Sequence, residues 1–356
     1  MSTPLDPVVF AAQALEARGA LLEHDPDGLF LLLPDTVARE LTVPAELRLG
    51  ARPDLAGTTF AGLGSALLDQ LTQPLRRAVV TSALTLELPA PRLAQAQSLA
   101  ERMVLRNAVH EIIDAGPRTV PYVLLVISWV AESDDRTEGL LVDAACALDG
   151  AAPEPAWIAR QSPLGWGLDE PLLPGPQADP GVALSLLARR LERQVRHEHL
   201  PALTTSLERR KQRDHERIAA YFGEMIDETR SARRRTAPEA VVAKVAHLLG
   251  ERDTKLRDLD TRYALTVRLA PVAVVTVAVP SVGVRLRVRR RKESREMLVR
   301  LPAGASSLDR LACDGCGGVT ARPAVCDDRL HVLCEECAPQ ATGRIDCPAC
   351  AARSKR

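Results

Sequence analysis

The amino-acid sequence predicts a multidomain α+β protein, and three features support that prediction. Runs of β-branched and aromatic residues bounded by turn-forming residues occur over 102–148 and again over 266–305, as is typical of antiparallel strands. Between these regions, apolar residues recur at spacings of three, four and seven, as on one face of a helix. Residues 306–356 are rich in paired cysteines, which indicates a small metal-binding module.

These features divide the chain into five predicted parts. They are an acidic α+β domain with an antiparallel meander (1–150), a proline-rich linker (151–180), an antiparallel helical hairpin of the coiled-coil type (181–265), a small basic β unit (266–305) and a C-terminal zinc-binding module (306–356). We expect the domain boundary in the linker, because prolines at this density interrupt both helices and strands. Trp157 and Trp166 are expected to anchor the linker by burying apolar area.

In the acidic part, the sequence predicts mixed helix and loop followed by the meander. Helices are expected near 6–18 and 65–80, with a short apolar run at 29–33 between them. The meander consists of MVLRNAVHEIID, VPYVLLVISWVAE and GLLVDAACAL, separated by turns at 115–117 and 133–136. The first of these three runs also fits a helix.

In the helical part, a long helix is expected from Gly181 to about Thr229, interrupted near Pro201. Thr236-x-x-Glu239 forms a capping-box pattern with Pro238 in the first turn, which predicts where the second helix begins. The Arg-rich loop over 230–235 allows the two helices to fold back on each other. This hairpin with a basic tip is also a candidate surface for oligomerisation.

In the basic β unit, four strands are expected: RYALTVRL, VAVVTVAVP, VGVRLRVRRRK and EMLVRL. The third strand alternates, so that Val284, Leu286 and Val288 would face a core. Guanidinium groups would then line the other face about every 7 Å, close to the phosphate spacing along DNA. The alternative is an ordinary solvated face. The predicted nucleic-acid-binding residues are Arg285, Arg287, Arg289, Arg290, Arg291 and Lys292.

The net charge of zero conceals a difference between the halves of the chain. Residues 1–180 contain 12 Arg and Lys against 24 Asp and Glu, whereas residues 181–356 contain 34 against 22. This division predicts different partners for the two halves. We expect nucleic acid or another polyanion to bind the basic half and a protein partner to bind the acidic half.

The cysteine pattern is the most specific feature of the chain. Zn²⁺ takes four tetrahedral thiolate or imidazole ligands, and one Cys-x2-Cys turn supplies two of them. The pattern predicts two zinc ions, and the alternative is a single zinc with Cys326 and His331 only packing. Such closed sites leave no position for a substrate, so their expected role is structural. The predicted ligands are Cys313, Cys316, Cys326, His331, Cys334, Cys337, Cys347 and Cys350.

The sequence predicts a cytoplasmic protein that does not enter a membrane. Its amino terminus lacks the features of a secretory signal, and its longest apolar run, 120–131, is too short to span a bilayer as a helix. Thiols stay reduced in the cytoplasm, which favours metal binding over disulfides. Cys146 stands apart from the others and is expected to be a small buried apolar residue.

No catalytic motif is present in the sequence. It lacks the Gly-Lys-Ser/Thr phosphate loop, the Gly-x-Ser-x-Gly elbow and the His-Glu-x-x-His zinc motif. ATP hydrolysis, acyl transfer and zinc-peptidase chemistry therefore lack their usual residues. The interpretation favours a protein that is not an enzyme.

The eight zinc-ligand positions resemble the RING family in their spacing. The resemblance implies that ligand pairs one and three hold one zinc, and that pairs two and four hold the other; sequential pairing remains the alternative. Pro348 between Cys347 and Cys350 also suits the resemblance, whereas Asp314-Gly315 replaces the apolar residue with which RING ligases contact a conjugating enzyme. The resemblance implies a RING-like ubiquitin-type ligase or its scaffold.

The amino-terminal part is similar to a second family in the order of its elements. The segment TFAGLGSALLDQL, followed by a meander ending in VISWVAESDDRTEGLLVDAACAL, resembles the accessory region of bacterial SWI/SNF-type helicases. This resemblance implies a partner of an ATPase or a polymerase, without a motor of its own. The leading hypothesis is therefore a non-enzymatic zinc-binding, helicase-associated adaptor for nucleic acid or a nucleoprotein machine. The alternative is the ligase.

Overall fold

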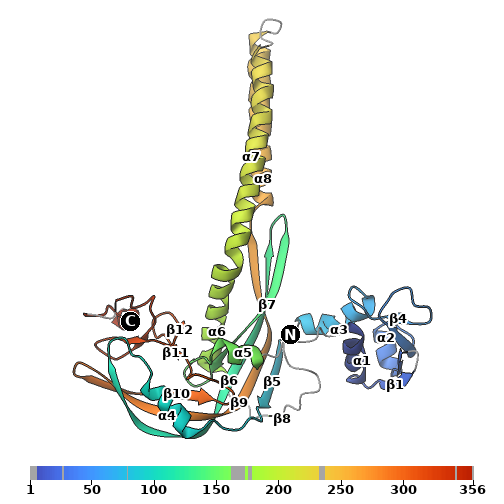
Figure 1. The fold of residues 1–356 in the computed structure, drawn as a ribbon. Helices are drawn as coiled ribbons and strands as arrows, with labels where there is room; N and C mark the ends of the chain where they lie inside the picture. The colour runs from blue at the N-terminus through green and yellow to red at the C-terminus, as the bar shows by residue number, and fades with distance from the viewer. Residues whose placement is uncertain are drawn as a thin grey trace. The chain divides into compact units, whose positions relative to one another are not determined.

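The computed structural model describes residues 6–25, 28–77, 79–161, 173–174, 179–231, 237–340 and 343–354 (Figure 1). It divides the chain into two compact units, Met1–Thr81 and Ser82–Arg356. The division therefore falls before the predicted meander and outside the predicted linker over 151–180. No helix in the described ranges combines the length and apolar character needed to cross a membrane.

The first unit is a small sheet covered by helices. Its strands lie in the order β1 (Leu21–Asp25), β2 (Gly28–Leu32), β3 (Glu46–Gly50) and β4 (Thr59–Phe60), and its helices are α1 (Pro7–Glu16), α2 (Asp35–Glu40) and α3 (Ala66–Arg77). Alternation in β2 buries Leu31 against Leu15 of α1 and Leu71 of α3. The helices expected near 6–18 and 65–80 are present, and the apolar run at 29–33 contributes β2.

The second unit is built on a sheet with two very long strands. Its order is β7 (Arg136–Cys146), β6 (Val109–Glu132), β9 (Thr266–Arg290), β5 (Val80–Thr85) and β8 (Leu173–Pro174), and β10 (Glu293–Pro302) also pairs with β9. Strands β6 and β9 are antiparallel over almost their full lengths, with Val109 opposite Arg289 and Glu132 opposite Thr266. The sheet therefore joins two regions, 102–148 and 266–305, that the sequence assigned to separate domains.

One expected turn and two expected breaks between strands lie inside these long strands. Residues 115–117 are part of β6, with Gly116 opposite Gly283 of β9. Three of the four strands expected over 266–305 form the single strand β9. Pro280 lies where β9 changes neighbours, because Leu86 donates to Ala278 and the pairing with β10 begins at Ser281. The proline is thus accommodated where pairing changes, and the absence of a side chain at Gly283 leaves room for the side chain of Arg118.

Helices occupy the chain between β7 and β9, where the sequence predicts the hairpin. They are α6 (Gly181–Gln194), a π-helical turn (Val195–His199), α7 (Leu200–Ser231) and α8 (Pro238–Arg262). The interruption expected near Pro201 corresponds to the π turn, since a proline without an N–H cannot continue the regular hydrogen-bond pattern. Helices α7 and α8 run side by side, with Phe222, Ile226 and Leu248 buried between them (Figure 1). The second helix begins at Pro238 as predicted, whereas Thr236 and Arg233–Arg235 lie outside the described residues.

The base of the hairpin is tied to the turn between β6 and β7. Arg262 Nε of α8 lies 2.6 Å from Asp134 Oδ1, and Arg210 Nη1 of α7 lies 2.5 Å from Asp135 Oδ2. Helix α6 packs on one face of the sheet, where Leu187 and Leu191 share a core with residues of β6. The hairpin is thereby connected to the sheet by both packing and ion pairs.

Part of the region expected to be a linker packs into another core of this unit. It contains α5 (Pro155–Arg160), in which Trp157 is fully buried and its Nε1 donates to Ala303 O at 2.8 Å. The anchoring role predicted for Trp157 is thus present, whereas Trp166 lies outside the described residues. Cys146 is fully buried beside this core, and burial raises the pKa of its thiol to about 12.

Candidate metal centre

The C-terminal module is made of short hairpins and a final helix. Its elements are β11 (Leu311–Ala312), β12 (Val319–Thr320), β13 (Ala324–Val325), β14 (Val332–Leu333) and α9 (Pro348–Ser354). Regular structure this short buries little apolar area, so the module needs another source of stability. Cysteine and histidine side chains occupy its interior instead, and Cys313 and Cys326 are 3% and 0% exposed.

Two groups of four ligand atoms lie inside the module, each with all atoms within 4.8 Å of one another. The first group consists of four cysteines, and the second consists of three cysteines and a histidine. Cys316 Sγ lies 3.6 Å from Cys334 Sγ in the first, and Cys326 Sγ lies 3.9 Å from Cys350 Sγ in the second. Tetrahedral zinc with bonds of about 2.3 Å places its sulfur ligands about 3.8 Å apart. The spacing fits zinc and is too long for disulfides, which are about 2.05 Å. The first group is Cys313, Cys316, Cys334 and Cys337, and the second is Cys326, His331, Cys347 and Cys350.

The grouping is the interleaved one, with ligand pairs one and three in one site and two and four in the other. Sequential pairing, the alternative from the sequence, does not occur. His331 Nδ1 lies 3.6 Å from Cys326 Sγ, 3.5 Å from Cys347 Sγ and 3.4 Å from Cys350 Sγ. Cys326 and His331 therefore point into a complete four-ligand site instead of only packing.

Backbone and side-chain donors surround the sulfur atoms. Gly318 N donates to Cys316 Sγ at 3.4 Å, and Arg193 Nη1 of α6 donates to the same sulfur at 3.8 Å. Burial alone would raise the pKa of Cys316, but these donors and neighbouring thiols lower it to about 7. Burial and nearby thiols raise the pKa of Cys337 in the same site. Four neighbouring thiols cannot all ionise without a cation, and a divalent metal removes that conflict.

The donor set fits zinc better than other common metals. Thiolate and imidazole ligands suit Zn²⁺, whereas Mg²⁺ and Ca²⁺ take oxygen ligands. Each group supplies all four ligands from the protein, so a tetrahedral ion in it would have no open position. When bound, such an ion holds the loops together and performs no chemistry on a substrate.

The module is continuous with the sheet of the second unit. Leu311, Val325 and Val332 of the module share one apolar core with Leu286 and Val288 of β9. Asn107, just before β6, donates to Val325 O at 3.0 Å and accepts from Val325 N at 2.9 Å. The sequence carries no signal for Asn107, because its partner lies far away along the chain.

Arg290 forms the strongest polar link between the module and the sheet. Its Nε lies 3.0 Å from Asp327 Oδ1, and the two side chains are only 7% and 6% exposed. Its remaining nitrogens donate to Asn107 O at 2.9 Å and Gly343 O at 2.8 Å. Arg291 Nε also reaches Asp327 at 2.9 Å. This corrects the expectation that Arg290 faces solvent at the turn: strict alternation already places it on the face of Val284, Leu286 and Val288.

The other arginines of β9 lie on the opposite face, as alternation predicted. Val284, Leu286 and Val288 are fully buried, whereas Arg285, Arg287 and Arg289 keep 44%, 40% and 53% of their side chains exposed. The neighbouring strands add carboxylates to this face. Glu111 Oε1 of β6 lies 3.0 Å from Arg287 and 2.7 Å from Arg289, and Glu296 of β10 lies 3.9 Å from Arg285 and Arg287. The face therefore carries mixed charge, and Lys292 is exposed at its end.

Comparison with known proteins does not assign this chain to a family. No protein-family model matches it, and no curated protein matches it significantly. The two four-ligand groups therefore define it as a protein with candidate zinc sites, on the geometry alone.

Proposed function

We propose that this protein is a non-enzymatic, zinc-stabilised adaptor that binds nucleic acid or a nucleoprotein machine. The observation that carries the proposal is the closure of both metal sites, each with four protein ligands, within a module that shares its core with the main sheet. Closed metal sites of this kind stabilise the fold and do not bind a substrate. The binding function of the protein is therefore expected on its surface.

The surface proposed for phosphate contact is the exposed face of Arg285, Arg287 and Arg289, which we call the arginine face. It is supported by the excess of basic residues over 181–356 and by the regular spacing of the three side chains. Glu111 and Glu296 compete for these guanidinium groups, so a phosphate backbone must displace them. We therefore expect weak, strongly salt-dependent binding, with a Kd in the range of about 10⁻⁴ to 10⁻⁶ M.

Changing Arg285, Arg287 and Arg289 together to Ala is expected to abolish binding of a short labelled DNA duplex or RNA in fluorescence anisotropy at low salt. The change Glu111→Gln is expected to strengthen binding, because it removes a competing carboxylate without changing the shape of the side chain. In the control, Arg209, Arg213 and Arg217 of α7 are changed together to Ala, which removes the same amount of positive charge. The affinity of this control for nucleic acid should stay near that of the unmodified protein. Undetectable binding by the unmodified protein, or equal loss in the control, would contradict this assignment.

The proposal includes protein partners. The acidic residues over 1–180 support contact with a basic protein, and the resemblance to helicase accessory regions suggests an ATPase or a polymerase. On the hairpin, Tyr221 and Val242 are 58% and 69% exposed, which supports a second copy of the chain as a partner there. Light scattering is expected to show a dimer that Val242→Glu dissociates, and a monomer at high concentration would rule out this contact.

The ligase remains the alternative, because the interleaved sites have the ligand grouping of the RING family. The packing of residues 314–317, around the second ligand, argues against it. Asp314 Oδ2 accepts from Val332 N at 2.7 Å, and Arg193 Nη2 donates to Cys316 O at 3.3 Å. A Cβ added at Gly317 would lie 2.8 Å from Leu186 of α6, so this segment already packs within the protein. Binding to a ubiquitin-conjugating-type enzyme would distinguish the ligase from the adaptor.

A further inference from the structure

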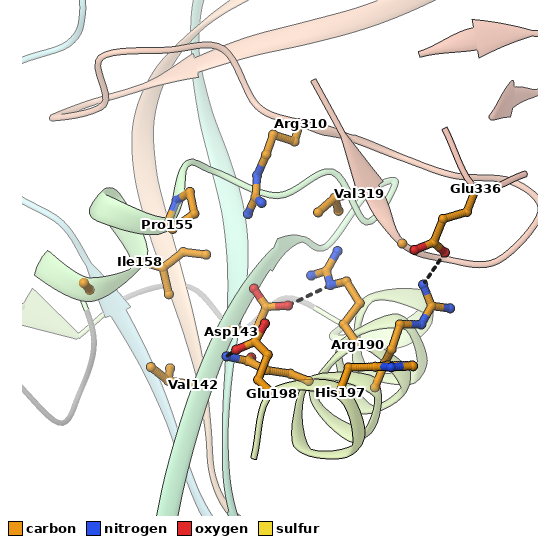
Figure 2. Close-up of a pocket in the computed structure, with 14 residues that line it drawn as sticks. Val142, Asp143, Pro155, Ile158, Arg190, His197, Glu198, Arg310, Val319 and Glu336 are labelled. Atoms are coloured by element: carbon orange, nitrogen blue, oxygen red, sulfur yellow. Dashed lines mark hydrogen bonds and ion pairs between the residues drawn. The ribbon is translucent and has the colours of Figure 1, made fainter. Parts of the chain in front are cut away.

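A cavity lies in the second unit between helices α5 and α6, strand β7 and the C-terminal module (Figure 2). Its volume is about 580 Å³, within the range of pockets that bind small molecules. Three arginines reach it: Arg190 and Arg193 from α6, and Arg310 from the segment before β11. None of these residues belongs to the arginine face, so the cavity is independent of the proposed nucleic-acid contact.

Among the described residues, Arg310 is a cation without a paired carboxylate. Its Nη2 donates to Pro153 O at 2.9 Å, and its Nε is buried with no hydrogen-bond partner in the described part of the chain. Each neighbouring carboxylate contacts another group, although Asp309 Oδ1 is buried with no hydrogen-bond partner within the described ranges. Asp143 pairs with Arg190 at 2.7 Å, Glu154 pairs with Arg160 at 3.5 Å, and Asp309 accepts from Tyr122 at 2.6 Å.

Arg310 is half-buried, and a partly desolvated cation without a paired carboxylate is costly, so this arrangement favours an anion. Burial lowers the pKa of Arg310 from its ordinary value and the like charge of Arg190 adds to that effect, while the nearby carboxylates of Asp143, Asp309 and Glu154 offset it only in part. Figure 2 shows Arg310 extending from one wall of the cavity toward Asp143 and Arg190. An oxyanion between them would supply acceptors for the donors of Arg310 and offset the repulsion between the two guanidinium groups.

The remainder of the cavity suits a ligand with an apolar body. Val142 of β7 and Pro155 and Ile158 of α5 line the side away from Glu336 (Figure 2). The opposite wall is where the regular helix α6 gives way to the π turn, which places His197 and Glu198 at the cavity. Interruptions of this kind often occur at functional sites, because they redirect side chains at some cost to helix stability.

We propose that this cavity binds a small molecule that joins an apolar group to one oxyanion, a carboxylate or a phosphate, and that Arg310 is its principal anion contact. Arg190 contributes at the same end of the cavity while it remains held by Asp143. The apolar wall contacts the body of the ligand. Pockets with an apolar lining and a few polar groups that fix orientation are typical of small-molecule sites.

The test uses the zinc-loaded full chain with phenyl phosphate and benzoate as amphipathic probes and inorganic phosphate as a probe without an apolar body. Isothermal titration is expected to show phenyl phosphate or benzoate binding more tightly than inorganic phosphate. The amphipathic probe that binds more tightly shows whether the site prefers a phosphate or a carboxylate. Absence of binding by both amphipathic probes up to about 10 mM, where even a weak site with a millimolar Kd would be filled, overturns the proposal.

The change Arg310→Met keeps most of the side-chain volume and removes the charge. It is expected to weaken binding of the better probe at least about tenfold, because loss of a desolvated charge contact has effects of that size or larger. The same change should leave the melting temperature of the ligand-free protein unchanged or higher, since it removes a half-buried cation that has no paired carboxylate among the described residues. A purely structural role for Arg310 would instead lower the melting temperature and leave affinity unaltered, and that result overturns the proposal.

Two further variants separate binding from folding. Ala159 is exposed on α5 at the cavity, and Ala159→Trp is expected to block the probe without entering the core. Arg289→Met removes an exposed arginine far from the cavity lining and should not change probe affinity. The site is contradicted if the Ala159→Trp variant binds the probe as tightly as the unmodified protein does. It is also contradicted if Arg289→Met loses as much probe affinity as Arg310→Met.

Discussion

Removal of zinc is expected to unfold the C-terminal module and to destabilise the sheet beneath it. Each four-ligand zinc site in a small domain contributes an apparent free energy of about 10 to 16 kcal/mol at neutral pH. The module has little regular structure of its own, and its residues Leu311, Val325 and Val332 complete the core over β9. Loss of the module therefore exposes Leu286 and Val288, which are fully buried in the intact protein.

Elemental analysis is the first measurement, and two zinc ions per chain are expected. A strong chelator should then lower the melting temperature followed by circular dichroism and release both ions. Cys316→Ser and Cys350→Ser each remove one ligand, from different sites, and each is expected to lower the zinc content. The matched control is Cys146→Ala, which changes a buried cysteine outside both sites and should retain two ions. An ordered, metal-free module would contradict the assignment.

Lowering the pH should also release the zinc, as measured by the metal content of the protein. Thiolate and imidazole ligands must lose their protons to bind zinc, so zinc affinity falls as the pH is lowered. The stability that depends on zinc is therefore expected to be complete at neutral pH and to decrease in acid. In the Cys146→Ala control this dependence should be unchanged.

The substitution Arg290→Met is expected to be the most damaging single change to the joint between the sheet and the module. It leaves the carboxylate of Asp327, which is 6% exposed, without its buried partner. Breaking a buried ion pair from one side costs about 3 to 5 kcal/mol, because the remaining charge stays desolvated. Arg291 also contacts Asp327, so we expect a loss near the lower limit, about 3 kcal/mol, in denaturant unfolding.

Arg289 provides a closely matched control, because it is the adjacent residue of the same strand on the opposite face. Its pair with Glu111 is solvent exposed, with side chains 53% and 47% exposed. Exposed pairs contribute at most about 1 kcal/mol, so Arg289→Met should have a small effect. Equal losses for the two variants would show that Arg290 does not stabilise the joint.

The Asp327 pair also predicts a pH dependence. Burial alone would raise the pKa of Asp327, but hydrogen bonds from Arg290 and Ile345 N outweigh it and hold that pKa below its ordinary value. The stabilisation is therefore present above the pKa of Asp in the unfolded chain, about 3.9, and is lost as the pH falls through the folded-state value. In Arg290→Met the pKa of Asp327 should rise, so stability should begin to fall at a higher pH.

Several features of this protein could be predicted from the sequence because they depend on neighbouring residues. The alternation of Val284 and Leu286 with Arg285 and Arg287 determines which side chains are buried once a strand forms. Pro238 marks the start of a helix, because proline fits the first turn of a helix better than later turns. The eight metal ligands are recognisable because a Cys-x2-Cys turn supplies two ligands from one short segment.

The pairing of β6 with β9 was not predictable in the same way. Its partners are separated by the entire helical hairpin, and the local turn signals at 115–117 and near Pro280 suggested shorter strands. A strand with an unpaired edge takes whichever strand the rest of the fold brings to it, and local propensity does not specify that partner. The expected division into an acidic meander and a basic β unit therefore gave way to one shared sheet.

The sequence by itself indicated the candidate metal ligands, the helices near 6–18, 65–80 and within 181–265, and the two faces of β9, since each follows from chelate spacing or from a period of 3.6 or 2 residues. Only the tertiary structure decided that Arg290 pairs with Asp327, that Glu111 and Glu296 share the arginine face, and that Arg310 lacks a paired carboxylate among the described residues. The physical reason is that the environment of a charge depends on groups from several distant segments. Those groups meet only when the chain has folded.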